Sequence, residues 1–419
     1  MRGGAWARWG AVVLATFGAT AEGPAEAVAI EHATVFVPGG PPIKDATVVL
    51  AGGKVAAVGR GVAVPAGARR IDAQGKVVTP GLIDAFGQAG LTEIEAEDTA
   101  NDTHPPGALL PSFRLRDGYN PRSAVVPISR AGGVTTVVLE SQSGILSGEA
   151  AAVDLAGDRL ERALVRDAAA QVAVITDASV TAFAGARGEA WRKLRTALED
   201  ARFYAANRAA YDGNRTRPLS LPRPDLEALL PVLRGEEPLV IVAHRASDIE
   251  LALKLADDFK LKWVLAGAAE AWLMAPELAT HKVPVIVDPW ANLPASFDRL
   301  RARDDLAALL AKAGVEVIVA TFTPNESRQL WQRAGDAVRF GMDHDAAVRA
   351  VTEAPAKAFG LKGYGRLEAG AVGNVVVWSG DPLQTSTRVE HVFVRGVEES
   401  LVTRQTELLK RYRRMPGSR

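Results

Sequence analysis

Short apolar runs, bounded by glycine and proline, open and close this chain. β-Branched residues dominate the early runs at 33–37, 46–50 and 54–58, and similar runs return at 374–378 and 390–396. Runs of this kind are typical of strands joined by tight turns in antiparallel hairpins. Because they occur at both chain ends and flank a different pattern, we predict one small β-sandwich domain built from residues 28–76 and 366–400.

The middle of the chain has a different pattern, in which near-continuous apolar runs alternate with amphipathic segments. One such segment, 248–259, has an apolar face and a charged face at helical spacing. Apolar runs occur at 77–84, 135–139, 172–175, 239–243, 263–266, 283–287 and 315–320. Buried strands separated by helices predict a parallel sheet covered on both faces. We therefore predict the α/β class and a (β/α)8 TIM-like barrel over 77–365, with a doubly wound open sheet as the alternative.

The eighth strand of that barrel is the least distinct part of the pattern. Residues 150–155 are apolar enough to form it, but no helical segment precedes them. We assign the eighth strand to this run because the other seven are clear.

The first 27 residues have the organisation of an export signal. Arg2 and Arg8 precede the apolar run 11–17, and small residues follow at 19–21 and 25–27. A charged start, a short apolar core and a small-residue cleavage site are typical of a secretory signal peptide. The run is also shorter than the roughly 20 residues that a membrane span needs. We expect a signal peptide at 1–27, a periplasmic or secreted mature protein without a membrane span, and a C-terminal helix and tail at 401–419.

Composition excludes several classes of protein. Lys+Arg and Asp+Glu balance at 49 each, which gives no basic surface for a nucleic acid. The chain has no cysteine, which excludes disulfides, cysteine-ligated zinc and thiol nucleophiles. We expect the partner to be a small-molecule ligand or substrate rather than a nucleic acid.

The segment Val77–Asp84 (VVTPGLID) resembles the first barrel strand of the metal-dependent amidohydrolase superfamily. Four further landmarks follow in the family's order: 131–136 (AGGVTT), 354–361 (APAKAFGL), 365–370 (GRLEAG) and 375–383 (VVVWSGDPL). The chain is most similar to the exported, imidazolonepropionase-like branch, whose complete members hydrolyse C–N bonds in cyclic amides or dipeptide-like substrates. The resemblance implies a hydrolase-type scaffold.

The metal ligands that this resemblance implies are mostly replaced. In the family a His-x-His pair follows the aspartate, whereas this chain has Phe86 and Gln88, as in a divergent group of the branch. Residues 266–268 (Ala, Gly, Ala) replace the sixth-strand histidine, and Phe322 replaces the aspartate that activates water. Of the implied set, His244 alone remains, at the end of the fifth-strand run.

This loss has a direct chemical consequence. A catalytic Zn²⁺ needs about three protein ligands and an open position for water. We therefore predict a degenerate metal site and expect no cofactor. A divalent metal such as zinc fits only if other residues form a substitute site.

Acidic residues near the predicted strand ends are candidates for such a substitute. Glu140, Asp288 and Glu270 are the catalytic candidates, and Glu140, His244 and Asp288 together are a candidate mononuclear metal site. Each acid also has a structural interpretation, since Glu270 suits a helix start and Asp288 a turn before proline. No spacing signature selects among these acids, so the sequence assigns no catalytic residue.

Three functions remain open at this stage. The chain is a C–N hydrolase with a rebuilt or metal-free site, a solute-binding protein, or a silent paralogue. The silent paralogue would bind a ligand, form homo-oligomers or pair with an active homologous amidohydrolase. The predicted ligand-binding residues at the carboxyl ends of the strands are His244, Phe86, Gln88, Phe322 and Trp290.

Overall fold

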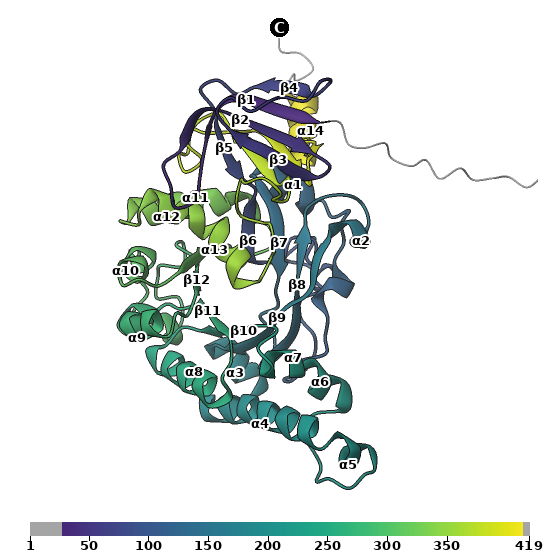
Figure 1. The fold of residues 1–419 in the computed structure, drawn as a ribbon. Coiled ribbons are helices and arrows are strands. Elements are labelled where there is room, and N and C mark those ends of the chain that lie inside the picture. Colours follow the sequence, from purple (N-terminus) through teal and green to yellow (C-terminus); the bar gives the residue numbers. More distant parts are fainter. Residues whose placement is uncertain (1–26, 414–419) are drawn as a thin grey trace, which may run out of the picture.

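The computed structural model describes residues 27–413 (Figure 1). Apart from its last residue, the predicted signal peptide lies outside the described residues, as do residues 414–419 of the predicted tail. Within the described range, no helix has both the length and the apolar character that crossing a membrane requires.

Strands from both chain ends build a β-rich domain, at the top of Figure 1. Its sheet has the order β16-β15-β14-β5-β1-β2-β3, with β4 also paired to β1. The early and late parts of the chain meet where β5 pairs with β14 in antiparallel register. This arrangement confirms a small β domain formed from both ends. Its strands are β1 (Val28–Val35), β2 (Ile43–Ala51), β3 (Lys54–Gly59), β4 (Arg69–Asp72), β5 (Val77–Pro80), β14 (Val375–Trp378), β15 (Val389–Val394) and β16 (Val397–Glu399).

A second eight-stranded sheet has the order β13-β12-β11-β10-β9-β8-β7-β6 and curls into a nearly closed barrel. Its first and last strands approach each other where the Phe322 N–H donates to the Phe86 carbonyl at 2.9 Å. This sheet confirms the predicted TIM-like barrel over the doubly wound alternative. Its strands are β6 (Leu82–Gly87), β7 (Val134–Leu139), β8 (Leu146–Asp154), β9 (Leu164–Ile175), β10 (Leu239–Ala243), β11 (Trp263–Gly267), β12 (Val285–Val287) and β13 (Val317–Val319).

The run predicted as one strand, 77–84, is two strands that belong to different sheets. β5 ends at Pro80 and β6 begins at Leu82, so the chain changes domain at Gly81. A Cβ at Gly81 would lie 2.1 Å from Thr135 Oγ1, so only glycine allows this close crossing. The apolar pattern runs through the break because both strands are buried.

The eighth strand also differs from the expectation. β8 is antiparallel to both of its neighbours, β7 and β9, whereas the other strand pairs of the barrel are parallel. Only residues 140–145 link β7 to β8, and so short a link allows a hairpin but no crossover helix. The missing helix before this strand was therefore the signal of its direction.

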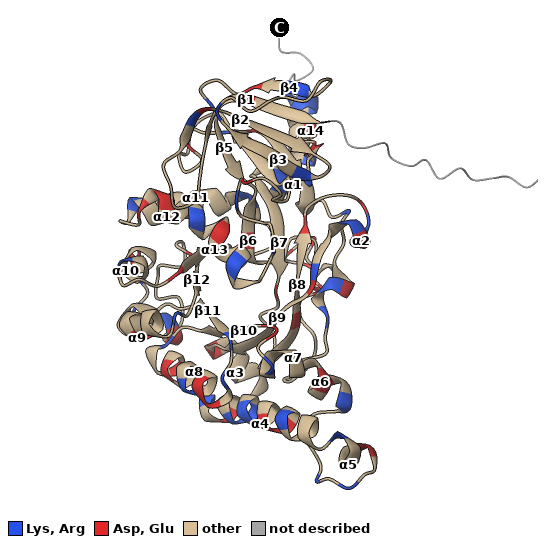
Figure 2. Ribbon diagram, viewed as in Figure 1, with Lys and Arg blue, Asp and Glu red and all other residues tan. Residues whose placement is uncertain are grey.

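Helices cover the outside of the barrel, and Figure 2 shows that α4 and α8 carry many of the charged residues. The predicted amphipathic helix is α8, which buries Ile249, Ala252 and Leu255 against the sheet. The helices are α1 (Val125–Ala131), α2 (Leu160–Ala163), α3 (Asp177–Phe183), α4 (Arg187–Ala206), α5 (Arg208–Asp212), α6 (Arg223–Ala228), α7 (Leu230–Leu233), α8 (Ala246–Phe259), α9 (Ala275–Thr280), α10 (Leu306–Lys312), α11 (Leu330–Arg339), α12 (His344–Ala350), α13 (Glu353–Ala358) and α14 (Arg404–Tyr412).

The seam between β6 and β13 is held by a buried carboxylate. Asp84 accepts hydrogen bonds from the Thr321 N–H at 3.1 Å, from the Thr321 hydroxyl and from the Ser327 hydroxyl at 2.7 Å. Its side chain is fully buried, and these donors occupy both carboxylate oxygens. Asp84 therefore joins the two ends of the barrel sheet rather than contributing to a reactive site.

Candidate functional site

The carboxyl ends of the barrel strands form the end of the barrel at which barrel enzymes carry their reactive groups. We call this end the mouth. Val138, Val242 and Ile286 belong to the apolar cluster inside the barrel. Side chains alternate along a strand, so the residue two positions further on points inward too. The side chains so placed at the mouth are Glu140, His244 and Asp288.

An aromatic pair fills part of the mouth. Phe86 and Phe322 stack with ring centroids 4.6 Å apart and an interplanar angle of 26°. Phe322 has a left-handed backbone (φ +58°), and its carbonyl accepts a hydrogen bond from the Gln142 amide at 3.2 Å. Gln88 is buried just after β6. Two of the positions where the resemblance predicts metal ligands are thus occupied by phenylalanine rings, which offer no donor atom to a metal and accept no proton.

Glu140 is a fully buried acid at the mouth. Among residues 27–413, neither oxygen of its carboxyl group has a hydrogen-bond partner. Burial raises the pKa of the Glu140 carboxyl well above its usual value. Burial therefore favours the protonated form, in which the group holds an unused donor and an unused acceptor.

His244 follows β10 and is 3% exposed. Its Nε2 accepts a hydrogen bond from Arg299 Nε at 3.1 Å. Burial, and then the nearby charge of Arg299, lower the pKa of His244 to about 3. The ring is therefore neutral, and because Nε2 accepts, its proton is on Nδ1, a buried atom that has no hydrogen-bond partner within the described part of the chain.

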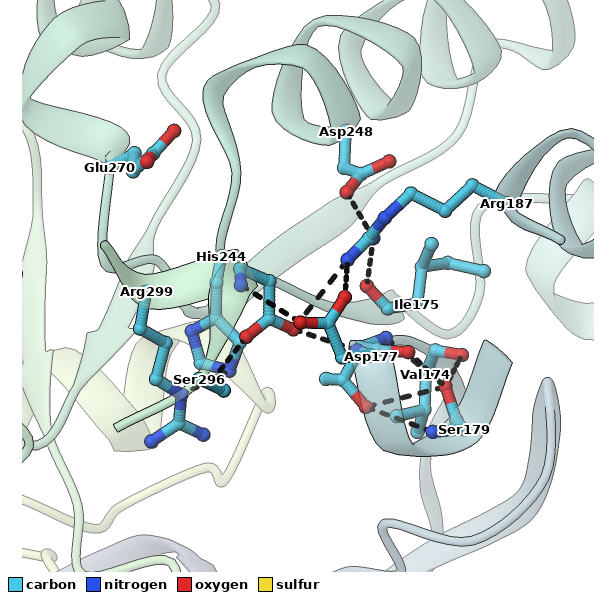
Figure 3. Close-up of polar contacts among 12 residues, drawn as sticks. Val174, Ile175, Asp177, Ser179, Arg187, His244, Asp248, Glu270, Ser296 and Arg299 are labelled. Carbon is cyan, nitrogen blue, oxygen red and sulfur yellow. Dashed lines mark hydrogen bonds and ion pairs between the residues drawn. The ribbon is translucent and has the colours of Figure 1, made fainter. Parts of the chain in front are cut away.

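Arg299 reaches His244 from the loop between β12 and α10, and a polar network anchors this loop (Figure 3). Asp298 and Asp177 exchange hydrogen bonds, since each backbone N–H donates to the carboxylate of the other residue, at 2.9 and 2.8 Å. Arg187 bridges Asp177 and Asp248. The network thereby ties the loop to the ends of β9 and β10 and holds Arg299 over the mouth.

Gly267 makes room for the imidazole of His244. It has φ +83°, and a Cβ there would lie 2.4 Å from His244 Cε1. A side chain at this position would therefore displace the ring from its contact with Arg299.

We expect Gly267→Ala to lower the free energy of unfolding by about 2–4 kcal/mol, because it adds a steric clash to an unfavourable backbone conformation. The control is Gly185→Ala, which has φ +75° but no atom within 4 Å of the added Cβ. Urea denaturation of both variants measures the difference. Equal losses would show that the space around His244 has no part in the effect.

The other acidic candidates are bound to structural partners. Asp288 pairs with Arg333 at 2.8 Å and accepts a hydrogen bond from the backbone N–H of Trp290. Burial raises the pKa of Asp288. The Trp290 indole donates to Asp336 at 2.6 Å. Glu270 accepts from the Ala246 N–H at 3.0 Å and so caps the start of α8.

The proposed substitute metal site is not formed. Within residues 27–413, no group of three or more His, Asp or Glu side chains is close enough to hold a metal ion. The hypothesis of a Glu140–His244–Asp288 site therefore has no support in the described residues, where Asp288 pairs with Arg333 and His244 accepts a hydrogen bond from Arg299. The donors present at the mouth do not fit the metal centre that the family uses.

A cavity of about 1030 Å³ opens at the opposite end of the barrel, near Lys262, Val283, Val315 and Lys357. These residues lie before or at the starts of β11, β12 and β13, or on α13. We nevertheless assign the candidate site to the mouth, because buried polar atoms without partners lie there and the strand ends converge there.

Comparisons with known proteins agree with the barrel. The amidohydrolase family matches residues 245–398. An amidohydrolase from Thermotoga maritima MSB8 is 26% identical, with a TM-score of 0.81 over 88% of this chain and 99% of that chain. An adenosine deaminase from Xanthomonas campestris with bound zinc is 15% identical, with a TM-score of 0.54 over 92% of this chain and 97% of that chain, and shows the fold alone.

A second amidohydrolase is similar in sequence to this chain. The amidohydrolase tasK of Hapsidospora irregularis is 23% identical over 369 residues, which cover 80% of this chain. The match spans only 38% of that protein's length. Together these likenesses support the amidohydrolase superfamily and a hydrolase scaffold for this chain.

Proposed function

We propose that this chain, on its amidohydrolase-type scaffold, is a small-molecule-binding protein that has lost metal-dependent hydrolysis of C–N bonds. The observation that carries the proposal is the hydrogen bond from Arg299 to His244 Nε2. The one remaining ligand of the family's set already uses its lone pair, and a guanidinium cation stands next to it. A metal ion at this nitrogen would have to displace that contact and overcome the repulsion.

Acid–base hydrolysis without a metal is also poorly supported by the mouth. A general base must be unprotonated and able to take a proton near neutral pH. Burial raises the pKa of Glu140 and so favours its protonated form, and the lowered pKa of His244, about 3, makes its imidazole a weak base. Asp288 is held by Arg333. No pair of groups at the mouth has the complementary acid and base character that activates water.

Binding, in contrast, suits the same groups. A buried polar atom without a partner costs roughly 1–3 kcal/mol, which a ligand that supplies the partner can recover. Glu140 and the Nδ1–H of His244 are such atoms, and the partly exposed ring of Phe322, stacked on the buried Phe86, adds apolar surface. A cavity with a few unused polar groups and aromatic walls is the usual composition of a small-molecule site.

Turnover measurements test this proposal. The purified protein is supplied in turn with zinc, manganese or no metal and is assayed against cyclic amides, dipeptides and N-acyl amino acids. A zinc hydrolase of the same fold serves as the positive control in the same buffers. We expect no turnover above that of the buffer. Turnover that disappears in His244→Ala would contradict the proposal.

A second candidate is a structural partner subunit, and one surface favours it. Helix α14 leaves Leu408, Leu409 and Tyr412 exposed at 42%, 64% and 63%. Such a face is typical of a contact with another chain. A solution mass of one chain would count against this candidate, whereas a stable dimer would favour it. The export of the protein also remains part of our proposal, and it rests on the signal-like pattern of residues 1–27.

A further inference from the structure

The guanidinium of Arg299 is held by only one of its nitrogens. Nε donates to His244, while in the described chain the two terminal nitrogens have neither a hydrogen-bond partner nor an ion-pair partner. Figure 3 shows the terminal nitrogens turned away from His244 and from the network around Asp177. The side chain is partly exposed, so a ligand can reach these nitrogens.

From this geometry we infer that Arg299 binds the carboxylate of the ligand, and that the ligand of the mouth is a small carboxylic acid with an apolar body. The inference rests on the proposed function and names the class of ligand that the same site takes. Arginine presents parallel N–H donors that match the two oxygens of a carboxylate, which makes it well suited to this recognition.

Two other arginines near the mouth already have carboxylate partners. Arg187 pairs with Asp177 and Asp248, and Arg333 pairs with Asp288 and Glu326. The terminal nitrogens of Arg299 differ because no protein carboxylate is placed against them.

Asp298, the sequence neighbour of Arg299, does not fill this role. Its carboxylate accepts hydrogen bonds from the Ser296 hydroxyl and from the Asp177 N–H, and it lies 3.8 Å from Arg187. The carboxylate of Asp298 is therefore engaged by Ser296 and Asp177, and although the charge of Arg299 acts on it, no hydrogen bond or ion pair joins the two side chains within residues 27–413.

His244 acts as a positioning residue in this site. Its neutral, buried ring fixes Nε of Arg299. Fixing that atom sets the direction in which the two terminal nitrogens of the planar guanidinium point. Gly267 leaves the space in which the ring stands. A guanidinium group that is oriented before the ligand binds loses less conformational freedom on binding than a free arginine side chain does.

Apolar residues on either side of Arg299 indicate the body of the ligand. Phe297 is 84% exposed and Leu300 is 58% exposed, on the loop that carries the arginine. Large apolar side chains left in solvent beside a cation favour a ligand with both characters. An aryl or alkyl carboxylate would accept hydrogen bonds from the terminal nitrogens of Arg299, and its apolar part would cover Phe297 and Leu300.

Calorimetric titration with phenylacetate and hexanoate as probes tests the inference, with phenylacetamide as the uncharged comparison. We expect both acids to bind saturably, and phenylacetamide to bind at least about tenfold more weakly than phenylacetate. Arg299→Gln should weaken the binding of phenylacetate at least about tenfold, since it removes the charged guanidinium group. The matched control is Arg301→Gln, which removes the same charge from an exposed residue of the same loop and should leave binding unchanged.

The role of His244 is tested by rescue. His244→Gln keeps an acceptor for Arg299 Nε and should retain most phenylacetate binding, whereas His244→Leu should lose it. Equal weakening by both variants would remove the positioning role. A thermal unfolding curve for each variant confirms that it is folded.

Two results would overturn the inference. One is the absence of saturable binding of either acid to the wild-type protein, and the other is equal weakening by Arg299→Gln and Arg301→Gln. Either result leaves the proposed function standing if turnover is also absent. Metal-dependent turnover together with loss of phenylacetate binding in Arg299→Gln would instead contradict the proposed function and retain the carboxylate site.

Discussion

Replacing Glu140 by glutamine is expected to stabilise the protein by an amount that grows with pH. The unfolded chain ionises this carboxyl near its ordinary value of 4.5, whereas the folded protein retains the proton to well above that value. The stability that Glu140 contributes is thus fully present below about pH 4.5 and is lost as pH rises towards the folded-state pKa. Between those values, the wild type loses about 1.4 kcal/mol per pH unit relative to Glu140→Gln, because glutamine does not ionise.

Urea denaturation at pH 5, 6, 7 and 8 measures this difference. The control is Glu250→Gln on the exposed face of α8, which removes the same charge from a solvated position. The control is expected to follow the wild type at each pH. If the free energies of unfolding of the wild type and of Glu140→Gln differ by the same amount at every pH from 5 to 8, Glu140 is not a buried acid with a raised pKa.

Replacing Asp154 by alanine is expected to cost about 3–5 kcal/mol of stability, the effect of breaking a buried charge pair. Asp154 is fully buried at the end of β8. It accepts hydrogen bonds from Arg395 at 2.7 Å, Tyr364 at 2.9 Å, Asn374 at 3.0 Å and Thr136 at 2.8 Å. These donors come from the barrel and from the C-terminal part of the chain, so the substitution removes a link between the two and leaves several donors unpaired.

Asp158→Asn is the matched control for this second prediction. Its carboxylate pairs with Arg122, and the two side chains are 60% and 70% exposed, so we expect a far smaller loss of stability than in Asp154→Ala. Urea denaturation at pH 7 compares the two variants. A loss in Asp154→Ala no greater than that of the control would show that the buried network does not hold the domains together.

Hydrophobic periodicity located most of the barrel because a strand buried on both faces leaves a continuous apolar run. The same signal does not carry the direction of a strand, so β8 was expected to be parallel although its short link to β7 requires a hairpin. The hydrophobic pattern also does not show where the chain passes from one sheet to another. The run 77–84 was therefore predicted as one strand, although the chain crosses between the sheets at Gly81. In both places the connections held information that the apolar pattern lacked.

The placement of the candidate residues at one end of the barrel was predictable from the sequence, but the contacts that hold them together were not. Strand ends placed Phe86, Glu140, His244 and Phe322 at the mouth, because alternation along a strand is a local property. Arg299 was not found, since it approaches His244 from a loop 55 positions away in sequence. Its partner depends on the anchoring of the loop by Asp177, and no spacing in the sequence encodes such a contact.

The metal content of the wild-type protein tests the central claim most directly. The protein is purified without chelators from cells grown with added zinc and manganese, and its metal is measured by mass spectrometry beside that of His244→Ala. Our account predicts well below one metal ion per chain and no difference between the two proteins, since His244 Nε2 is engaged by Arg299. A ratio near one metal per chain in the wild type that falls in His244→Ala would contradict it.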